Sequence, residues 1–273
     1  MKKVEGKTNL FLSLILALLI IITSGSSLFS SNFYSKETFN WGTQSIGQDG
    51  IDLFLIAPLL IITSVIFYRK RTALLLWSGI LFYLIYTYVI YCFTLHFNKF
   101  FIAYCVILGL SFYLFQYFLL SQIQKPIVKS MTNKRVRKII GIYFIAIACL
   151  FYLLWLTEII WAVMNNSMPA SLVGTGLFTN PVHAIDLSVC LPALFITGFL
   201  LLKQNVFGLL LTPAMLVFCI LMDITIGVLV VLMKSKGLEG DYSIAVVMFM
   251  LALLSAVLLI WFMKYLEMLP NKE

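Results

Sequence analysis

Charged residues are scarce in this sequence. They make up 11% of its 273 residues, against about 25% in a typical soluble domain. Hydrophobic residues make up 62%, and the mean hydropathy is +1.04. This composition excludes an ordinary water-soluble domain and indicates a protein that lies in a membrane.

Groups that usually carry catalysis or hold cofactors are also few. The five cysteines all fall in apolar runs and none forms a CxxC pair, so neither a disulfide framework nor a zinc knuckle is indicated. The two histidines, His96 and His183, fall at the ends of apolar runs, which disfavours a haem held deep between helices. No Gly-rich phosphate loop, GxSxG or HExxH motif occurs. The sequence therefore names no cofactor and no metal.

Long apolar runs, by contrast, are abundant. A helix needs about 20 mostly apolar residues to cross a bilayer core, and the continuous runs here lack the alternation of a β-barrel. We predict an all-α multi-pass membrane protein with eight transmembrane helices. The predicted spans are 9–27, 51–68, 73–95, 99–121, 139–162, 183–202, 206–233 and 242–264. The first also fits a signal peptide, but the repeat described below requires a helix there, so we predict a retained span.

Lysine and arginine are distributed unevenly between the two sides of these spans. With the N-terminus inside, Lys36, Lys99, Lys234 and Lys236 lie outside, and the other fifteen of the 19 basic residues lie inside. Cytoplasmic loops carry the positive excess, so we predict that both termini are cytoplasmic and that the protein lies in the inner (cell) membrane. This distribution explains the net charge of +8 without nucleic acid as a partner.

The densest basic segment is KPIVKSMTNKRVRK, from Lys125 to Lys138. One interpretation is a plain topology signal. The other is a contact with anionic lipid headgroups, which would contribute about 1 kcal/mol per basic side chain. The lipid bilayer itself is the one partner that the sequence indicates, and protein partners are undetermined.

A short motif occurs twice. IDLFLIAPLLIIT at residues 51–63 and IDLSVCLPALFIT at residues 185–197 agree at seven of thirteen positions, at an offset of 134 residues. Aspartate and proline are rare in transmembrane helices, so their repetition carries more weight than the leucine and isoleucine matches. The same offset superimposes the first and third spans on the fifth and seventh, whereas the fourth and eighth align only if KSKGLEGD is an insertion. We predict two parallel four-helix repeats, residues 1–138 and 139–273.

Pro58 and Pro192 occupy equivalent positions in the two copies. Each proline removes a helical hydrogen bond, so the carbonyls of Phe54 and Ser188, four residues earlier, are predicted to lose their partners. A transmembrane helix tolerates this where neighbouring side chains or water satisfy the freed group. The repeated proline indicates either a packing kink or a functional feature.

Acids inside the predicted spans are the strongest candidates for a functional site. The two copies of the motif present Asp49-x-x-Asp52 and His183-x-x-Asp186, and residues three apart share a helix face. Two further acids lie within the fifth and seventh spans, and all of these groups fall in the outer half of the membrane when residues are counted from the cytoplasmic ends. The predicted ligand-binding residues are Asp52, Glu158, His183, Asp186 and Asp223.

Structural interpretations remain open for most of these residues. Asp49 and Asp52 fit the cap and third residue of a helix that begins near residue 50. Asn180 and Pro181 form a second cap with a first-turn proline, which places Asp186 too deep for capping to explain.

The other candidates differ in how well a structural role explains them. His183 and Glu158 fit side chains at the membrane interface, where Glu158 stands between two tryptophans. Asp223 is deepest and needs a partner or water. Possible supporting hydroxyl groups in the third span are those of Tyr83, Tyr86, Tyr88 and Tyr91.

Three functions fit this pattern. The favoured hypothesis is binding or transport of a small ligand or cation through an outward-facing acidic pocket between the two repeats. The alternatives are an intramembrane enzyme that acts on a lipid-linked or extracytoplasmic substrate, and an accessory or sensor subunit that uses an aromatic outer loop. The sequence does not decide whether the protein is an enzyme.

The repeated Asp-Leu-x-x-x-x-Pro pattern, together with NPVHAIDL and YLIYTYVIY, resembles a group of bacterial multi-pass membrane proteins without assigned function. The resemblance covers most of the chain after the first span. It implies a bacterial inner-membrane setting and carries no catalytic residues.

Overall fold

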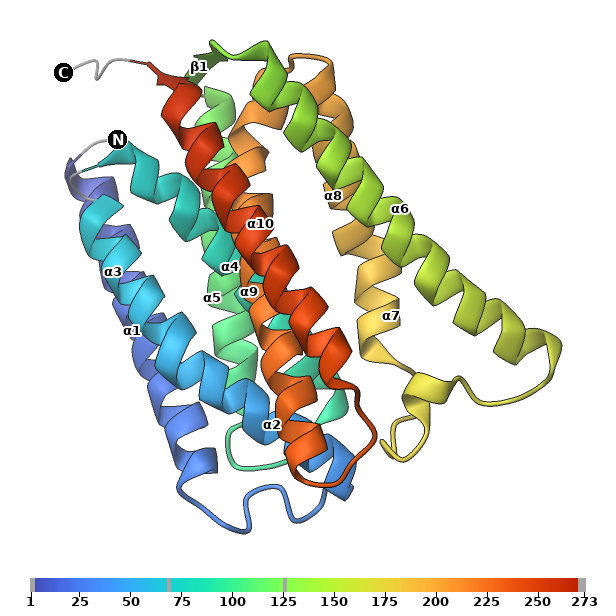
Figure 1. Cartoon of the computed structure of the whole chain (residues 1–273). Coiled ribbons are helices and arrows are strands. Elements are labelled where there is room, and N and C mark those ends of the chain that lie inside the picture. The colour runs from blue at the N-terminus through green and yellow to red at the C-terminus, as the bar shows by residue number, and fades with distance from the viewer. Residues whose placement is uncertain (1–2, 68–69, 125–126, 270–273) are drawn as a thin grey trace.

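The computed structural model describes residues 3–67, 70–124 and 127–269 (Figure 1). Within these residues, eight helices are long and apolar enough to cross a membrane, so the chain has the all-α fold of a multi-pass membrane protein. The end of the predicted second span at residue 68 and the start of the basic segment at Lys125 lie outside the described residues.

The helices are joined by short loops, and two short strands lie beside the chain ends. The elements are α1 (Lys3–Leu28), α2 (Phe39–Ile51), the π-helical turn η1 (Asp52–Ile56), α3 (Ala57–Phe67), α4 (Arg71–Thr94), α5 (Phe101–Gln124), β1 (Val128–Met131), α6 (Lys134–Met164), the 3-10 turn η2 (Ala170–Leu172), α7 (Pro181–Ile185), the π-helical turn η3 (Asp186–Cys190), α8 (Leu191–Leu202), α9 (Val206–Ser235), α10 (Tyr242–Tyr265) and β2 (Leu266–Met268).

The predicted start of the second span is wrong by about three turns. The span begins at Phe39 rather than residue 51, and α2, η1 and α3 follow one another without a break. Thr38 caps it by accepting a hydrogen bond from the Trp41 backbone N–H at 3.2 Å. The composition of α2 is polar enough to resemble that of a loop. In the fold, however, several of these polar side chains are buried against the other helices.

This correction removes the capping interpretation of the first acidic pair. Asp49 and Asp52 lie in the middle of a continuous helix, far from its first turn. The second predicted cap is confirmed, because Asn180 accepts hydrogen bonds from the backbone N–H groups of Val182 and His183 at 2.9 and 3.3 Å. The remaining span boundaries differ from the predicted ones by a few residues.

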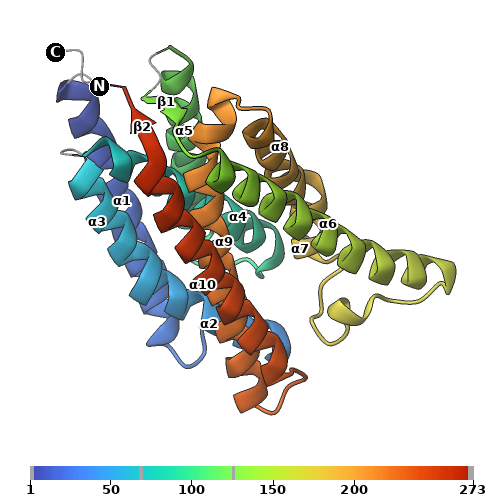
Figure 2. The ribbon, with the colours of Figure 1, turned by 45° about the horizontal axis from the view of Figure 1, so that its top comes forward.

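Helices α4 and α9 pack against each other at the centre of the bundle. On one side α3 and α5 pack against α4, and on the other α8 and α10 pack against α9 (Figures 1 and 2). Gly79 of α4 permits the central contact: a Cβ atom there would lie 2.6 Å from the Val217 Cβ and 2.7 Å from the Ala214 carbonyl oxygen of α9. The central pair therefore joins residues 1–138 to residues 139–273.

The basic segment between the two predicted repeats contains a strand that the sequence did not predict. Strand β1 pairs antiparallel with β2, and Ser130 lies opposite Glu267. In Figure 1 this strand lies at the end of the bundle where both termini are found. The loops after α1, α6 and α9 lie at the opposite end.

The two copies of the Asp-Pro motif share an unusual backbone. In each copy a π-helical turn begins at the aspartate and ends two residues before the proline. The Ala57 N–H donates to the Asp52 carbonyl, and the Leu191 N–H donates to the Asp186 carbonyl, five residues back in each case. In each copy the helix thus takes up one extra residue ahead of the proline.

Candidate functional site

A cavity of about 490 Å³ lies near the end of the bundle that carries the loops after α1, α6 and α9. Its wall comes from α2 and α4 of the first half of the chain and from α6, α7, α9 and α10 of the second. Most wall residues are apolar or aromatic, with a few amides, hydroxyls and one carboxylate among them. This volume and this composition are typical of a small-molecule site.

The carboxylate in the wall belongs to Asp186. Its Oδ2 accepts a hydrogen bond from Trp155 Nε1 of α6 at 2.9 Å. The Tyr86 hydroxyl of α4 also faces this carboxyl, in a geometry outside that of a hydrogen bond. Asp186 is half-buried, so part of its carboxyl remains accessible from the cavity.

Glu158 and His183 lie directly behind this wall. The His183 ring packs on the Trp155 ring with centroids 4.5 Å apart, and its Nε2 lies 3.7 Å from Glu158 Oε2. The other carboxylate oxygen of Glu158 accepts the Ser171 backbone N–H at 2.8 Å. Trp155 therefore connects three of the five predicted site residues, and Ser171 brings the 165–180 loop against the same wall.

The first acidic pair lies in a different environment. Asp49 accepts hydrogen bonds from three hydroxyl groups, those of Ser27 on α1, Tyr34 in the following loop and Tyr91 on α4, the last at 2.9 Å. Burial beside Asp49 raises the pKa of the Tyr34 phenol well above its usual range. Both carboxylate oxygens of Asp49 are thus paired, which fits a structural role.

Asp52 is completely buried and reaches the cavity only through a neighbour. Its Oδ1 accepts from Gln48 Nε2 at 2.9 Å, whereas its Oδ2 has no hydrogen-bond partner among the described residues. The same Gln48 nitrogen donates to the Tyr83 hydroxyl at 2.9 Å, and that hydroxyl bonds Thr225 of α9 at 2.8 Å. Gln48 and Thr225 both line the cavity, so Asp52 lies one residue behind its wall.

Asp223 does not join this group. It is buried on α9, and its neighbours Met222 and Thr225 line the cavity while it does not. Its carboxyl lies instead on the side of Tyr143, whose hydroxyl bonds Ser255 of α10 at 2.7 Å. The structure thus brings Asp186, His183 and Glu158 together, places Asp52 one residue away, and separates Asp223 from them.

Two wall residues carry polar groups that the protein leaves unpaired. Trp41 Nε1 and the Tyr86 hydroxyl are buried and have no hydrogen-bond partner among the described residues. Buried polar groups are nearly always hydrogen-bonded. Neither of these two atoms is itself accessible, so both lie just behind the cavity surface. The sequence did not single out Trp41, Gln48 or Trp155, although the i, i+4 spacing of Gln48 and Asp52 on one helix was a usable signal.

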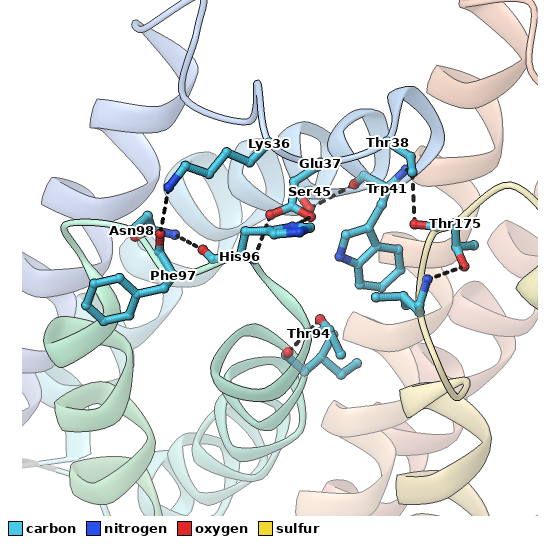
Figure 3. A network of polar contacts seen from close by, with 12 residues as sticks. Lys36, Glu37, Thr38, Trp41, Ser45, Thr94, His96, Phe97, Asn98 and Thr175 are labelled. Carbon is cyan, nitrogen blue, oxygen red and sulfur yellow. Dashed lines mark hydrogen bonds and ion pairs between the residues drawn. The ribbon is translucent and has the colours of Figure 1, made fainter.

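The loops at this end are tied together by polar contacts (Figure 3). Thr38 donates its hydroxyl hydrogen to the Thr175 carbonyl at 2.8 Å, and Thr175 lines the cavity. Glu37 accepts the His96 backbone N–H at 2.7 Å and contacts the His96 ring at 2.9 Å. Figure 3 shows Trp41 between these two contacts, so the 29–38 loop joins the loops on both sides of the cavity.

Within the described residues, no three His, Cys, Asp or Glu side chains are grouped so as to hold a metal ion. Comparisons of the chain with models of protein families, with curated proteins and with solved structures found no match.

Proposed function

We propose that the protein binds a small ligand in the cavity between its two halves and exchanges it with the aqueous phase on the loop side. The observation that carries this proposal is the cavity itself, an apolar chamber with one accessible carboxylate. Such a chamber contributes little to helix packing. An acid at this position also costs free energy unless it has a partner, which a bound ligand would supply.

The proposal includes the two-repeat organisation predicted from the sequence. The matching π-helical turns of η1 and η3, at the same offset of 134 residues as the sequence motif, support two related halves, residues 1–138 and 139–273. In this arrangement the ligand site lies where the halves meet, as is common in membrane proteins built from repeats.

The proposal also places the chain termini in the cytoplasm and the cavity on the outer side of an inner membrane. The excess of basic residues at the terminal end supports this orientation. Lys129, Lys134 and Arg135 are exposed there, beside β1. Their exposure supports the interpretation of the basic segment as a contact with anionic lipid headgroups.

Thiol accessibility tests this function. Ser45 lines the cavity and is buried, whereas Ser111 is buried in α5 away from it. In a background without the five native cysteines, Ser45→Cys should react with a membrane-impermeant maleimide added outside intact cells, and Ser111→Cys should not. Both proteins must first match the Tm of their parent. Equal protection of both positions would contradict a ligand site open to the outside.

A further inference from the structure

We propose that the cavity binds an organic ammonium ion, with the ammonium group at Asp186 and an apolar body in the rest of the chamber. This inference rests on the proposed function and names the chemical class of its ligand. Three features of the cavity wall carry it: the uncompensated carboxylate, the aromatic rings around it, and the apolar surface beyond them.

The first feature is the lack of a basic side chain beside Asp186. Among the described residues, none that lines the cavity is lysine or arginine. Within the part of the chain that the structure describes, the close contacts between a carboxylate and a basic or imidazole side chain are His96 with Glu37 and His183 with Glu158, and neither involves Asp186. A carboxylate inside a membrane protein needs a counter-charge or a proton, and a cationic molecule in the cavity would supply the charge directly at Asp186.

The second feature is the set of aromatic rings around this carboxylate. Trp155 holds Asp186 through its indole N–H, and its ring centroid lies 6.0 Å from that of Phe151. Tyr86 faces Asp186 from α4, and Tyr91 and Trp41 line the wall further along. Aromatic faces attract cations, most strongly for tryptophan, and alkylammonium groups are the ligands that such cages bind.

The third feature separates an organic cation from a metal ion. Beyond Asp186 the wall is formed largely by side chains such as Ile90, Leu229 and Met233. These groups cannot replace the water shell of a small inorganic ion, which prefers several oxygen ligands. They do favour contact with alkyl or aryl groups, because burial of apolar surface is favourable.

The test uses three ligands that share one apolar body and differ in charge: phenethylamine, 2-phenylethanol and 3-phenylpropionate. The Tm of the purified full-length protein should rise with the amine, because a ligand that binds only the folded state stabilises it. The alcohol and the acid should have much smaller effects. Asp186→Asn keeps an oxygen for Trp155 but removes the charge, and should weaken amine binding by about 10-fold or more. Asp223→Asn is the matched control, an acid removed away from the cavity, and should leave amine binding unchanged.

Ammonium groups also occur on lipid headgroups, and a second arm separates the two sources. The protein is placed in nanodiscs of phosphatidylglycerol with or without phosphatidylethanolamine. If ethanolamine lipid raises the Tm and Asp186→Asn abolishes that rise, the ammonium group comes from lipid. If only the soluble amine does so, the ligand is a free amine. Either result supports ammonium recognition by Asp186.

Protection of Ser45→Cys from maleimide distinguishes failure of this inference from failure of the proposed function. Protection by the alcohol or the acid as strong as that by the amine would overturn ammonium recognition and leave a ligand cavity. An accessible Ser45→Cys with no response to any amine or to ethanolamine lipid would also overturn it. An inaccessible Ser45→Cys, by contrast, would remove the proposed function itself.

Discussion

The helices that carry the two copies of the Asp-Pro motif differ in their surroundings although their backbones match. Each has a π-helical turn that starts at the aspartate and ends ahead of the proline. Asp52 is completely buried beside Gln48, behind the cavity wall. Asp186 is held by Trp155 and remains accessible from the cavity.

The residue three positions before each aspartate explains much of this difference. In the first copy it is Asp49, whose carboxylate binds three hydroxyl groups and ties α2 to α1, α4 and the loop between α1 and α2. In the second copy it is His183, which packs on Trp155 and leaves α7 beside the cavity. A backbone feature that occurs twice therefore carries a structural network in one helix and an accessible acid in the other.

The largest expected effect comes from removing the acid of the structural network. Asp49→Ala removes the carboxylate that accepts from three hydroxyl groups, and a hydrogen bond to a charged group contributes about 1.5–3 kcal/mol. Ser27 and Tyr91 keep the backbone carbonyls of Ser24 and Ser45 as alternative acceptors. We expect a loss of about 3 kcal/mol or more in the free energy of unfolding. The comparison is Asp186→Ala, which leaves only the Trp155 N–H unpaired, beside a cavity that water can enter. It should cost less than about 1 kcal/mol.

Unfolding in detergent with increasing denaturant measures the free energy of unfolding of both variants. Asp49→Asn is a useful intermediate, since it keeps one acceptor oxygen. Equal losses for Asp49→Ala and Asp186→Ala would contradict the division into a structural and an accessible acid.

A smaller loss of stability is expected from a change at the contact between α4 and α9. A methyl group at Gly79 would overlap Val217 and the Ala214 backbone of α9, so Gly79→Ala should push α4 away from α9. Overpacking of this kind costs about 1–3 kcal/mol. Gly109→Ala in α5 is the control, because nothing lies within 4 Å of its added Cβ atom. A Tm fall for Gly79→Ala alone supports the close contact, and similar values for both variants would contradict it.

The smallest effect is a pH dependence at Tyr34, in the loop between α1 and α2. Burial beside Asp49 raises the Tyr34 pKa, so above pH about 10 the unfolded chain loses this proton before the folded protein does. Stability is therefore fully present below that pH and falls as the pH rises, by up to about 1.4 kcal/mol per pH unit for this group. Tyr34→Phe should be less stable at pH 8 but should show a shallower alkaline fall. Parallel curves for the two proteins would contradict the assignment.

Much of the fold could be predicted because transmembrane helices depend on local composition. Runs of apolar residues of sufficient length located all eight helices within the described residues. The start of the second span could not be predicted in this way. Its first turns carry Thr43, Gln44 and Ser45, which become a buried or half-buried face only when neighbouring helices cover them. Strand β1 was missed for a related reason, since its pairing partner lies more than 130 residues away.

The candidate site was predictable in part. Spacing along a helix placed His183 and Asp186 on one face, and the fold brings them together with Glu158. Depth in the membrane, however, says nothing about direction around a helix axis. Asp223 was included for its depth, yet it does not line the cavity. Trp155 and Gln48 connect the acids through contacts between helices, which one sequence alone does not reveal.

The pairing of β1 with β2 has a mechanical consequence. These strands connect the segment that follows α5 to the end of α10, at the terminal end of the bundle. The cavity lies toward the opposite end, between helices of the two halves. The strand pair therefore holds two segments, more than 130 residues apart in the sequence, side by side at the end of the bundle away from the cavity.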